Sequence, residues 1–280
     1  MLWRGRQGSG NVEDRRGIGG PVAVGGGIIG VIALLFNLLT GGDVDPSQIP
    51  GMNGGGQSRQ LSPAEKARQD TLAEFSKVVL RETEVVWQQI LPQQAGQNYQ
   101  DPTLVLFTGA VQSACGNASS ATGPFYCPGD HKLYVDLSFF DELGQRFGAA
   151  GDFAMAYVIA HEVGHHIQTL LGTSEKMGRI RQQASETEYN KYSVMMELQA
   201  DFLAGVWAHY VKGKGLLEGG DIEEALTAAN AIGDDRLTQG RVSPDNFTHG
   251  TSQQRMYWFK KGYETGDVRQ GNTFQDPSLQ

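Results

Sequence analysis

The chain has 280 residues, a formal net charge of −8 and a pI near 5.3. An acidic chain of this kind lacks the basic face that nucleic-acid binders need for phosphates, so no nucleic acid is expected among its partners. Glycine is frequent, at 38 residues, and many of these glycines lie before Asp43 or between Gly51 and Gly56. This skew separates a non-globular N-terminal region from a more ordinary globular remainder.

The first predicted element is a membrane anchor at residues 21–39. This run of 19 residues carries no charge, and as a helix it would span roughly 28 Å, close to the thickness of the hydrocarbon core of a bilayer. Four arginines precede it within residues 1–20, and two aspartates follow it. Because positive residues stay on the cytoplasmic side, we expect a single-pass protein with a cytoplasmic N-terminal segment and its bulk periplasmic or extracellular.

A cleaved signal peptide is the alternative to an anchor. Its apolar core would be shorter, and no small-x-small cleavage site follows Leu39, so an uncleaved anchor fits better. Gly26 and Gly30 form a small-xxx-small pair that would let two such helices approach closely, which leaves a homodimer through the anchor open. Residues 40–61 are rich in Gly, Ser, Gln and Pro and are expected to form a flexible linker.

Residues 62–267 are expected to form a mostly helical α+β domain with a small sheet. Ser62, with a glutamate three residues later, has the pattern of a capping box that opens a long helix. Short apolar and β-branched runs at 103–107 and 132–137 predict two strands. Residues 268–280 are expected to be a disordered tail. Caps and four-residue apolar spacing predict further helices that begin at Ser138, Asp152, Ser185, Asp221 and just after Gly250.

Two cysteines, Cys115 and Cys127, bracket a short loop whose Gly, Pro and Asn residues suit turns. In an oxidising compartment they would form a disulfide, which contributes on the order of 3 kcal/mol for a loop of this length. Two free thiols are one alternative, and a metal site made by Cys127 and His131 is another. A lone cysteine and histidine leave a tetrahedral shell half empty, so the disulfide is favoured.

Residues 161–165 read HEVGH, an H-E-x-x-H motif on a predicted helix. Residues four apart share a helix face, so His161 and His165 can bind one Zn²⁺. Glu162 lies about 100° round the helix, from where it can take a proton from a water that the metal activates. The residues that flank the motif are apolar, which predicts a buried helix rather than a chance pair of surface histidines.

A catalytic zinc needs a third protein ligand and an open fourth position. Glu197 begins the sequence ELQAD, 32 residues after His165, on a second amphipathic helix. Asp201 lies four residues later on the same face. We therefore expect Glu197 to complete the ligand set and Asp201 to accept a hydrogen bond from a ligand imidazole. A solvated carboxylate face is the alternative for this pair.

The order HEVGH and then ExxAD resembles the gluzincin metallopeptidases, in particular their membrane-associated CaaX-protease-like branch. The wider context is similar to the bacterial neutral zinc metallopeptidase family, over the stretches CGNASSATGPFYCPGDHKLYVDLSFF, AYVIAHEVGHHIQ, ELQADFLAGVWA, AIGDDRL and THGTSQQRMYWF. This resemblance covers residues 62–266. It implies a zincin-like endopeptidase fold, with zinc between two helices and a peptide or protein substrate beside the small sheet.

The CaaX-protease-like branch also has a late His-Pro at its active site, with an arginine six residues after the histidine. His249 and Arg255 have this spacing, although Gly250 stands where the proline would be. The resemblance implies that His249 stabilises the oxyanion and that Arg255 braces the site. A helix-capping histidine and a surface arginine are the alternative.

These features together predict a membrane-anchored zinc metalloendopeptidase in which Glu162 is the general base. A non-catalytic, zinc-stabilised binding or scaffold protein is one alternative, although a purely structural site has no need of Glu162. A zinc amidase that acts on cell-wall material is another, because a zinc-activated water attacks any suitable amide. His131, His166 and His209 are not expected to bind metal.

Overall fold

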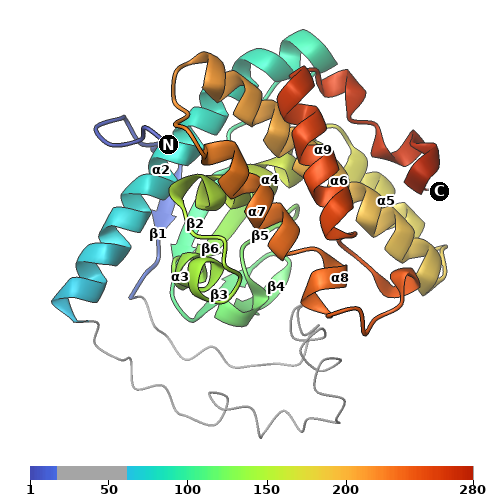
Figure 1. Cartoon of the computed structure of the whole chain (residues 1–280), viewed down its shortest axis with the longest axis horizontal. Coiled ribbons are helices and arrows are strands. Elements are labelled where there is room, and N and C mark those ends of the chain that lie inside the picture. Colours follow the sequence, from blue (N-terminus) through green and yellow to red (C-terminus); the bar gives the residue numbers. More distant parts are fainter. Residues whose placement is uncertain (18–61, 280) are drawn as a thin grey trace, which may run out of the picture.

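The computed structural model describes residues 1–17 and 62–279, and strand pairing joins the two stretches into one sheet (Figure 1). The strands are β1 (Val12–Asp14), β2 (Thr103–Phe107), β3 (Ala110–Ser113), β4 (Gly116–Ser119), β5 (Phe125–Cys127) and β6 (Lys132–Asp136). The α-helices are α2 (Pro63–Ala95), α3 (Ser138–Gln145), α4 (Asp152–Leu170), α5 (Thr173–Arg181), α6 (Glu186–Gly213), α7 (Asp221–Ala231), α8 (Asp234–Leu237) and α9 (Ser252–Thr265). Short 3₁₀ turns are η2 (Ser120–Thr122), η3 (Pro244–Asn246), η4 (Val268–Gln270), η5 (Thr273–Gln275) and η6 (Pro277–Leu279).

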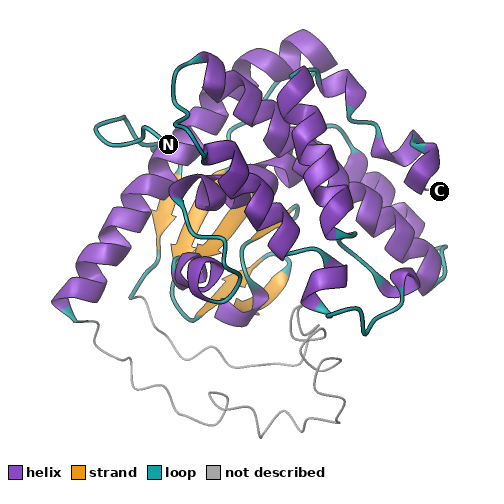
Figure 2. Cartoon of the chain, viewed as in Figure 1, coloured by secondary structure: helices purple, strands orange, loops and turns teal. Residues whose placement is uncertain are grey.

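The described residues form the predicted α+β fold, with helices around a small mixed sheet (Figure 2). The sheet order is β1-β2-β6-β5, in which β2 pairs in parallel with β1 and β6, and β5 pairs antiparallel to β6. Strands β2 and β6 confirm the two strands predicted from the apolar runs. Strand β1 and the β3–β4 hairpin were not predicted, because they are short and rich in polar residues or glycine. Strand β5 was not predicted because it has only three residues.

The two faces of the sheet have different neighbours because successive side chains of a strand point to opposite sides. Leu104, Leu106 and Val135 face the helices and join the main hydrophobic core. Val105 and Phe107 belong to a second, smaller cluster with Val111 of the β3–β4 hairpin. The predicted disulfide is confirmed: it joins Cys115, in the turn of this hairpin, to Cys127 at the end of β5.

Local capping signals place most helix starts correctly. At the start of α2, Glu65 N donates to Ser62 Oγ over 3.2 Å and Ser62 N donates to Glu65 Oε2 over 2.8 Å, which confirms the capping box. Helix α6 begins at Glu186, after Ser185 caps it by accepting from Glu188 N. The other predicted helices begin within two residues of the expected positions.

Residues 1–17 are part of the folded unit, which for these residues corrects the expectation of a separate N-terminal segment. Its side chains include the buried Met1 and Trp3, and Trp3 packs edge-on against Phe75 of α2. Strand β1 then adds to the sheet beside β2. This segment folds onto the domain because its apolar side chains are buried and its strand pairs with the sheet. The glycine-rich composition suggests neither of these.

The C-terminal segment is also ordered, so the expected disorder of residues 268–280 is wrong for residues 268–279. The Thr273 hydroxyl is fully buried and donates to Met195 O over 2.6 Å. Gly271 O accepts from Gln199 Nε2 over 2.9 Å. Side-chain hydrogen bonds to α6 thus hold a segment whose own sequence has no periodic apolar pattern.

Within the stretches that the structure describes, no helix combines the length and the apolarity needed to cross a membrane. The predicted anchor at 21–39 and the predicted linker at 40–61 lie outside the described residues.

Candidate metal centre

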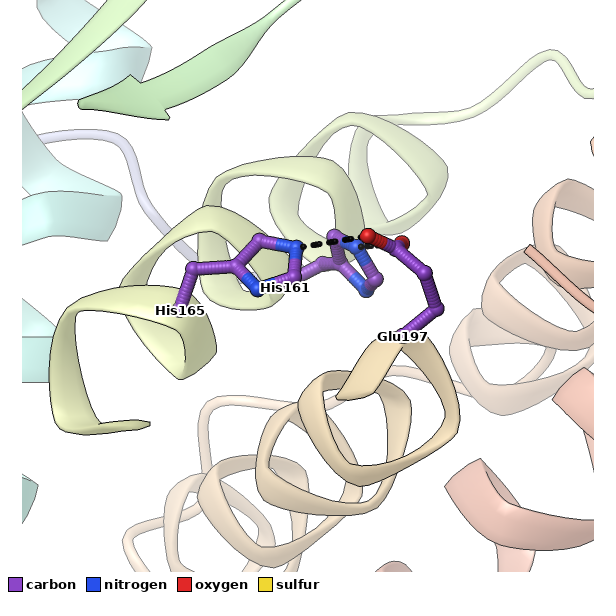
Figure 3. Close-up of side chains that lie close together, drawn as sticks. All are labelled: His161, His165 and Glu197. Atoms are coloured by element: carbon purple, nitrogen blue, oxygen red, sulfur yellow. Dashed lines mark hydrogen bonds and ion pairs between the residues drawn. The ribbon is translucent and has the colours of Figure 1, made fainter. Parts of the chain in front are cut away.

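Helices α4 and α6 bring the three predicted metal ligands together (Figure 3). His161 and His165 project from one face of α4 toward Glu197 of α6. The distance from His161 Nε2 to Glu197 Oε2 is 3.1 Å, and that from His165 Nε2 to Glu197 Oε1 is 3.3 Å. One ligand atom of each residue lies within 4.8 Å of the other two, so the group could hold a metal ion.

The spacing and chemistry of these atoms fit zinc. Zinc binds imidazole nitrogen and carboxylate oxygen at about 2.0–2.2 Å with tetrahedral angles, which separates neighbouring ligand atoms by about 3.3 Å. The nitrogen–oxygen distances of 3.1 and 3.3 Å are close to this value. Two histidines and one glutamate are also a donor set found at catalytic zinc sites, which keep a fourth position open.

Gly164 sets how closely the two ligand-bearing helices approach. It lies between the histidines on α4, and a β-carbon built on it would lie 2.9 Å from Ala200 O and 3.0 Å from Ala200 Cα on α6. Real β-carbons are rarely so close to backbone atoms. A glycine at this point of the motif therefore lets α4 lie against the turn of α6 that carries Glu197.

Asp201 lies beside His161 as predicted, fully buried. Its Oδ1 lies 2.8 Å from His161 Nδ1 and accepts from the Tyr157 hydroxyl over 2.5 Å. Arg255 of α9 donates to both carboxylate oxygens, from Nε over 2.8 Å and from Nη2 over 3.0 Å. Burial raises the pKa of Asp201, but Arg255 and His161 outweigh it and lower this pKa to about 2. An ionised Asp201 only accepts, so His161 carries a proton on Nδ1, and its Nε2 faces Glu197.

The centre has a strong preference for positive charge. Burial lowers the pKa of His161, but Asp201 and Glu197 outweigh it and raise the pKa to about 10. The pKa of Glu197 is well below its usual range, because His165 and His161 outweigh the effect of burial. Without a metal ion, protons on the imidazoles supply the positive charge that a divalent cation would bring.

Glu162 follows His161 directly and is 7% exposed. Burial raises the pKa of its carboxyl group, and the positive His165 and His161 partly offset this effect. The carboxylate therefore lies next to the ligand cluster in a water-poor setting, where a general base is expected.

His249 lies near the cluster, in the loop before α9. Its Nδ1 lies 3.1 Å from Asp234 Oδ1, and its backbone N–H donates to Asp234 Oδ2 over 2.6 Å. Burial lowers the pKa of His249, but Asp234 and Glu197 outweigh it, so the pKa is raised. Asp234 was not among the predicted site residues, because it lies 15 residues from His249 and no spacing signal connects the two.

The structure gives a reason for the glycine that follows His249. Gly250 has a φ of 88°, a value that proline cannot adopt. Its N–H also donates to Asp234 Oδ2 over 3.1 Å, a bond that proline would lack. The departure from the His-Pro pattern is therefore tied to how Asp234 holds this loop.

His166, His131 and His209 lie outside the group of His161, His165 and Glu197. His166 is 1% exposed, its Nε2 donates to Gln100 O over 2.6 Å, and burial lowers its pKa to about 4. His131 stacks edge-on against His166, and Nδ1 of His209 lies 2.8 Å from Tyr263 O.

A second acidic group, Asp152, Asp221 and Glu224, also has oxygens close enough to hold a metal ion. The Met1 ammonium nitrogen already lies 2.7 Å from Asp152 Oδ1 and 3.1 Å from Asp221 Oδ1. Burial lowers the pKa of this ammonium, but the carboxylates outweigh it and raise the pKa to about 10. An ammonium group of the chain thus already offsets part of the negative charge of this acidic group.

Comparison with known proteins agrees with this geometry. The family model described as "Putative neutral zinc metallopeptidase" matches residues 1–274. The uncharacterized protein YpfJ of Escherichia coli strain K12 is 49% identical over an alignment of 296 positions, gaps included, which covers 98% of this chain and 99% of YpfJ. The uncharacterized protein Rv2575 of Mycobacterium tuberculosis strain H37Rv is 44% identical over 210 residues, covering 70% of this chain and 68% of Rv2575. No solved structure matches the chain. The chain belongs to the neutral zinc metallopeptidase family.

Proposed function

We propose that the chain is a zinc-dependent metalloendopeptidase whose ligands are His161, His165 and Glu197. The observation that supports this most strongly is the convergence of two imidazole nitrogens on one carboxylate at tetrahedral spacing, 3.1 and 3.3 Å apart. Glu162 lies directly beside this cluster. A purely structural zinc site has four protein ligands and no use for a base, so this arrangement favours catalysis.

The roles of the side chains follow from their positions. When bound, zinc would polarise the scissile carbonyl and lower the pKa of a water. Glu162 takes the proton of the attacking water and passes it to the leaving amine. His249, held by Asp234, donates a hydrogen bond to the oxygen of the carbonyl as negative charge develops there. Arg255 acts at a distance, because it holds Asp201, which in turn orients His161.

Attachment to a membrane through residues 21–39 remains part of the proposal, with one revision. A single crossing would separate residues 1–17 from residues 62–279, whereas β1 pairs with β2 in one sheet. The expected orientation, with a cytoplasmic N-terminus and an external domain, therefore does not fit this fold. We propose that both flanks of the segment lie on one side, periplasmic or extracellular, where the Cys115–Cys127 disulfide is stable.

The location is tested by fractionation and by protease protection in intact cells. External protease should cleave an epitope tag placed after Gly17 and one placed after Leu279 under the same conditions. Extraction of the chain from the membrane fraction should require detergent. Tags that are exposed on opposite sides would overturn the revised orientation, and a chain found in the salt-washed soluble fraction would overturn attachment.

The metal site is tested by measuring zinc per chain in the purified full chain and in Glu197→Ala. About one zinc is expected in the wild type, with a large loss in the variant. Glu188→Ala is the matched control, because Glu188 is an exposed glutamate on the same helix. A wild type that takes up no zinc, or a Glu197→Ala variant that keeps it, would contradict the ligand assignment.

Catalysis is tested with a peptide library and with cell-wall fragments, using Glu162→Gln as the blank. Cleavage of peptides should fall by about 10²–10⁴-fold in this variant while zinc stays bound. Cleavage of cell-wall amides instead of peptides would favour the amidase alternative. Zinc binding with no cleavage of either substrate class would favour the non-catalytic alternative.

A further inference from the structure

The second metal-binding histidine has a partner that no sequence signal indicated. His165 Nδ1 lies 2.8 Å from Oε1 of Gln168, one turn further along α4. Gln168 is 0% exposed, so its amide cannot replace a protein hydrogen-bond partner with water. A buried amide whose hydrogen bonds are all made specifies one orientation, since any other leaves polar atoms unpaired.

The direction of every bond in this group is determined by a backbone carbonyl. Gln168 Nε2 lies 2.7 Å from Met196 O, which can only accept, so the amide nitrogen must face Met196. The amide oxygen therefore faces His165, whose Nδ1 must carry the proton that it donates. This leaves Nε2 of His165, which faces Glu197 Oε1 at 3.3 Å, as the nitrogen that can give up its proton and bind a metal ion.

Gln168 also connects the two ligand-bearing helices. Met196 immediately precedes Glu197 on α6, so the same side chain holds one ligand imidazole and the peptide unit next to another ligand. The second N–H of Gln168 lies within reach of Gln199 Oε1, at 3.1 Å. Gln199 in turn donates from Nε2 to Gly271 O over 2.9 Å.

The chain of amides ends in the C-terminal segment, which packs tightly on α6. A β-carbon built on Gly271 would lie 2.3 Å from the Phe202 ring, so this residue has no space to move toward the helix. Thr273 adds a second anchor by donating to Met195 O over 2.6 Å. The series of hydrogen bonds thus leads from His165 through Gln168 and Gln199 to the backbone of Gly271, which is held in place.

We propose that Gln168 is a positioning residue for the metal centre, which sets the tautomer of His165 and its distance from Glu197, and that Gln199 and residues 271–273 brace it. The inference rests on the proposed zinc function. Partners of metal-binding histidines of this kind change metal affinity by about 10–100-fold when they are replaced. The ordered C-terminal segment thereby has a role in metal binding, although the segment contributes no ligand.

The test is zinc affinity, measured by chelator competition with the full chain, together with the visible absorption of the Co²⁺-loaded protein. Gln168→Met keeps the volume of the side chain and removes every bond of its amide. We expect about 10–100-fold weaker zinc binding and a changed Co²⁺ spectrum. Gln94→Met is the matched control. It removes hydrogen bonds to Tyr210, Gly266 and Val268 that also hold the C-terminal segment but touch no ligand, so zinc affinity should stay within about twofold.

Three outcomes decide the matter. Wild-type zinc affinity and an unchanged Co²⁺ spectrum in a folded Gln168→Met variant would overturn the positioning role, while the proposed function would stand if Glu197→Ala still loses zinc. A wild type that binds no zinc would overturn the proposed function first.

If circular dichroism shows that Gln168→Met is unfolded, Gln199→Met replaces it. That variant keeps the hydrogen bonds of Gln168 to His165 and Met196, and we expect zinc binding to weaken by about tenfold. An affinity equal to that of wild type would overturn the bracing role of Gln199.

Discussion

The two histidines of the metal centre are held in different ways. On one side, His161 donates to a carboxylate, Asp201, which is neutralised by the guanidinium of Arg255. On the other side, His165 donates to the neutral amide of Gln168, which is bonded to a second amide. Both Asp201 and Gln168 are 0% exposed, so the partner of each histidine is fully removed from water.

The difference lies in what each side requires of its surroundings. A buried carboxylate costs several kcal/mol in lost hydration, which a hydrogen-bonded counter-charge must offset. Helices α4 and α9 therefore meet Asp201 of α6. They supply Tyr157 and His161 from α4 and Arg255 from α9. A buried amide needs only hydrogen-bond partners, which backbone carbonyls can provide. The charged side should thus be stability-critical, whereas the neutral side should matter mainly for metal binding.

The largest effect is expected from Arg255→Met, which breaks the charged side. Asp201 would remain buried with a single histidine as its cationic partner, so we expect a loss of about 3–5 kcal/mol in the free energy of unfolding. Urea denaturation of the metal-free protein measures this loss without a contribution from bound zinc. Gln168→Met should cost less under the same conditions, because it leaves no buried carboxylate without its counter-charge.

A double variant sharpens this comparison. Asp201→Leu with Arg255→Met removes both charges, and apolar replacements of a buried ion pair are often neutral for stability. We expect the double variant to regain most of the lost stability but to bind zinc about 10–100-fold more weakly than wild type, because His161 has lost its acceptor. A double variant as unstable as Arg255→Met alone would contradict the assignment of that loss to the unpaired charge.

The comparison also separates what the sequence reveals from what it hides. His161, His165, Glu197 and Asp201 were predicted because helical spacing of four residues is visible in a sequence, and because zinc needs a third ligand. Gln168 has the same helical proximity to His165, but a lone glutamine has no chemical signature. Its role depends on Met196 O, a backbone atom of another helix.

Elements of the fold that depend on contacts between distant parts of the chain were not predicted either. The helix starts and the two apolar strands were predicted, since capping and apolar spacing are local signals. The strand Val12–Asp14 and the ordered segment after Val268 were missed, because both owe their structure to partners far away in the chain. The Asp234–His249 pair was missed for this reason too.

A region away from both histidines gives the next largest effect. Cys115→Ala with Cys127→Ala removes the disulfide of the β3–β4 hairpin, and we expect a loss of about 3 kcal/mol in the free energy of unfolding. This hairpin covers the sheet face opposite the main helical core, so zinc affinity should stay unchanged. Reduction of the wild type should produce the same loss. Weaker zinc binding in the double variant would mean that the hairpin also supports the ligand helices.

The smallest effect is expected where the two sides meet, at Gly164. Gly164→Ala would improve helix propensity by about 0.5–1 kcal/mol, but its β-carbon would press on the backbone of Ala200 and force α4 and α6 apart, at a cost of about 1–3 kcal/mol. We expect a small net loss of stability and weaker zinc binding.

Gly178→Ala is the matched control, since Gly178 lies within α5 and a β-carbon there would meet nothing within 4 Å. It should stabilise the chain by about 0.5–1 kcal/mol and leave zinc binding unchanged. If both substitutions stabilise the chain equally and zinc affinity is unaffected, the close approach at Gly164 does not set the distance between the ligands.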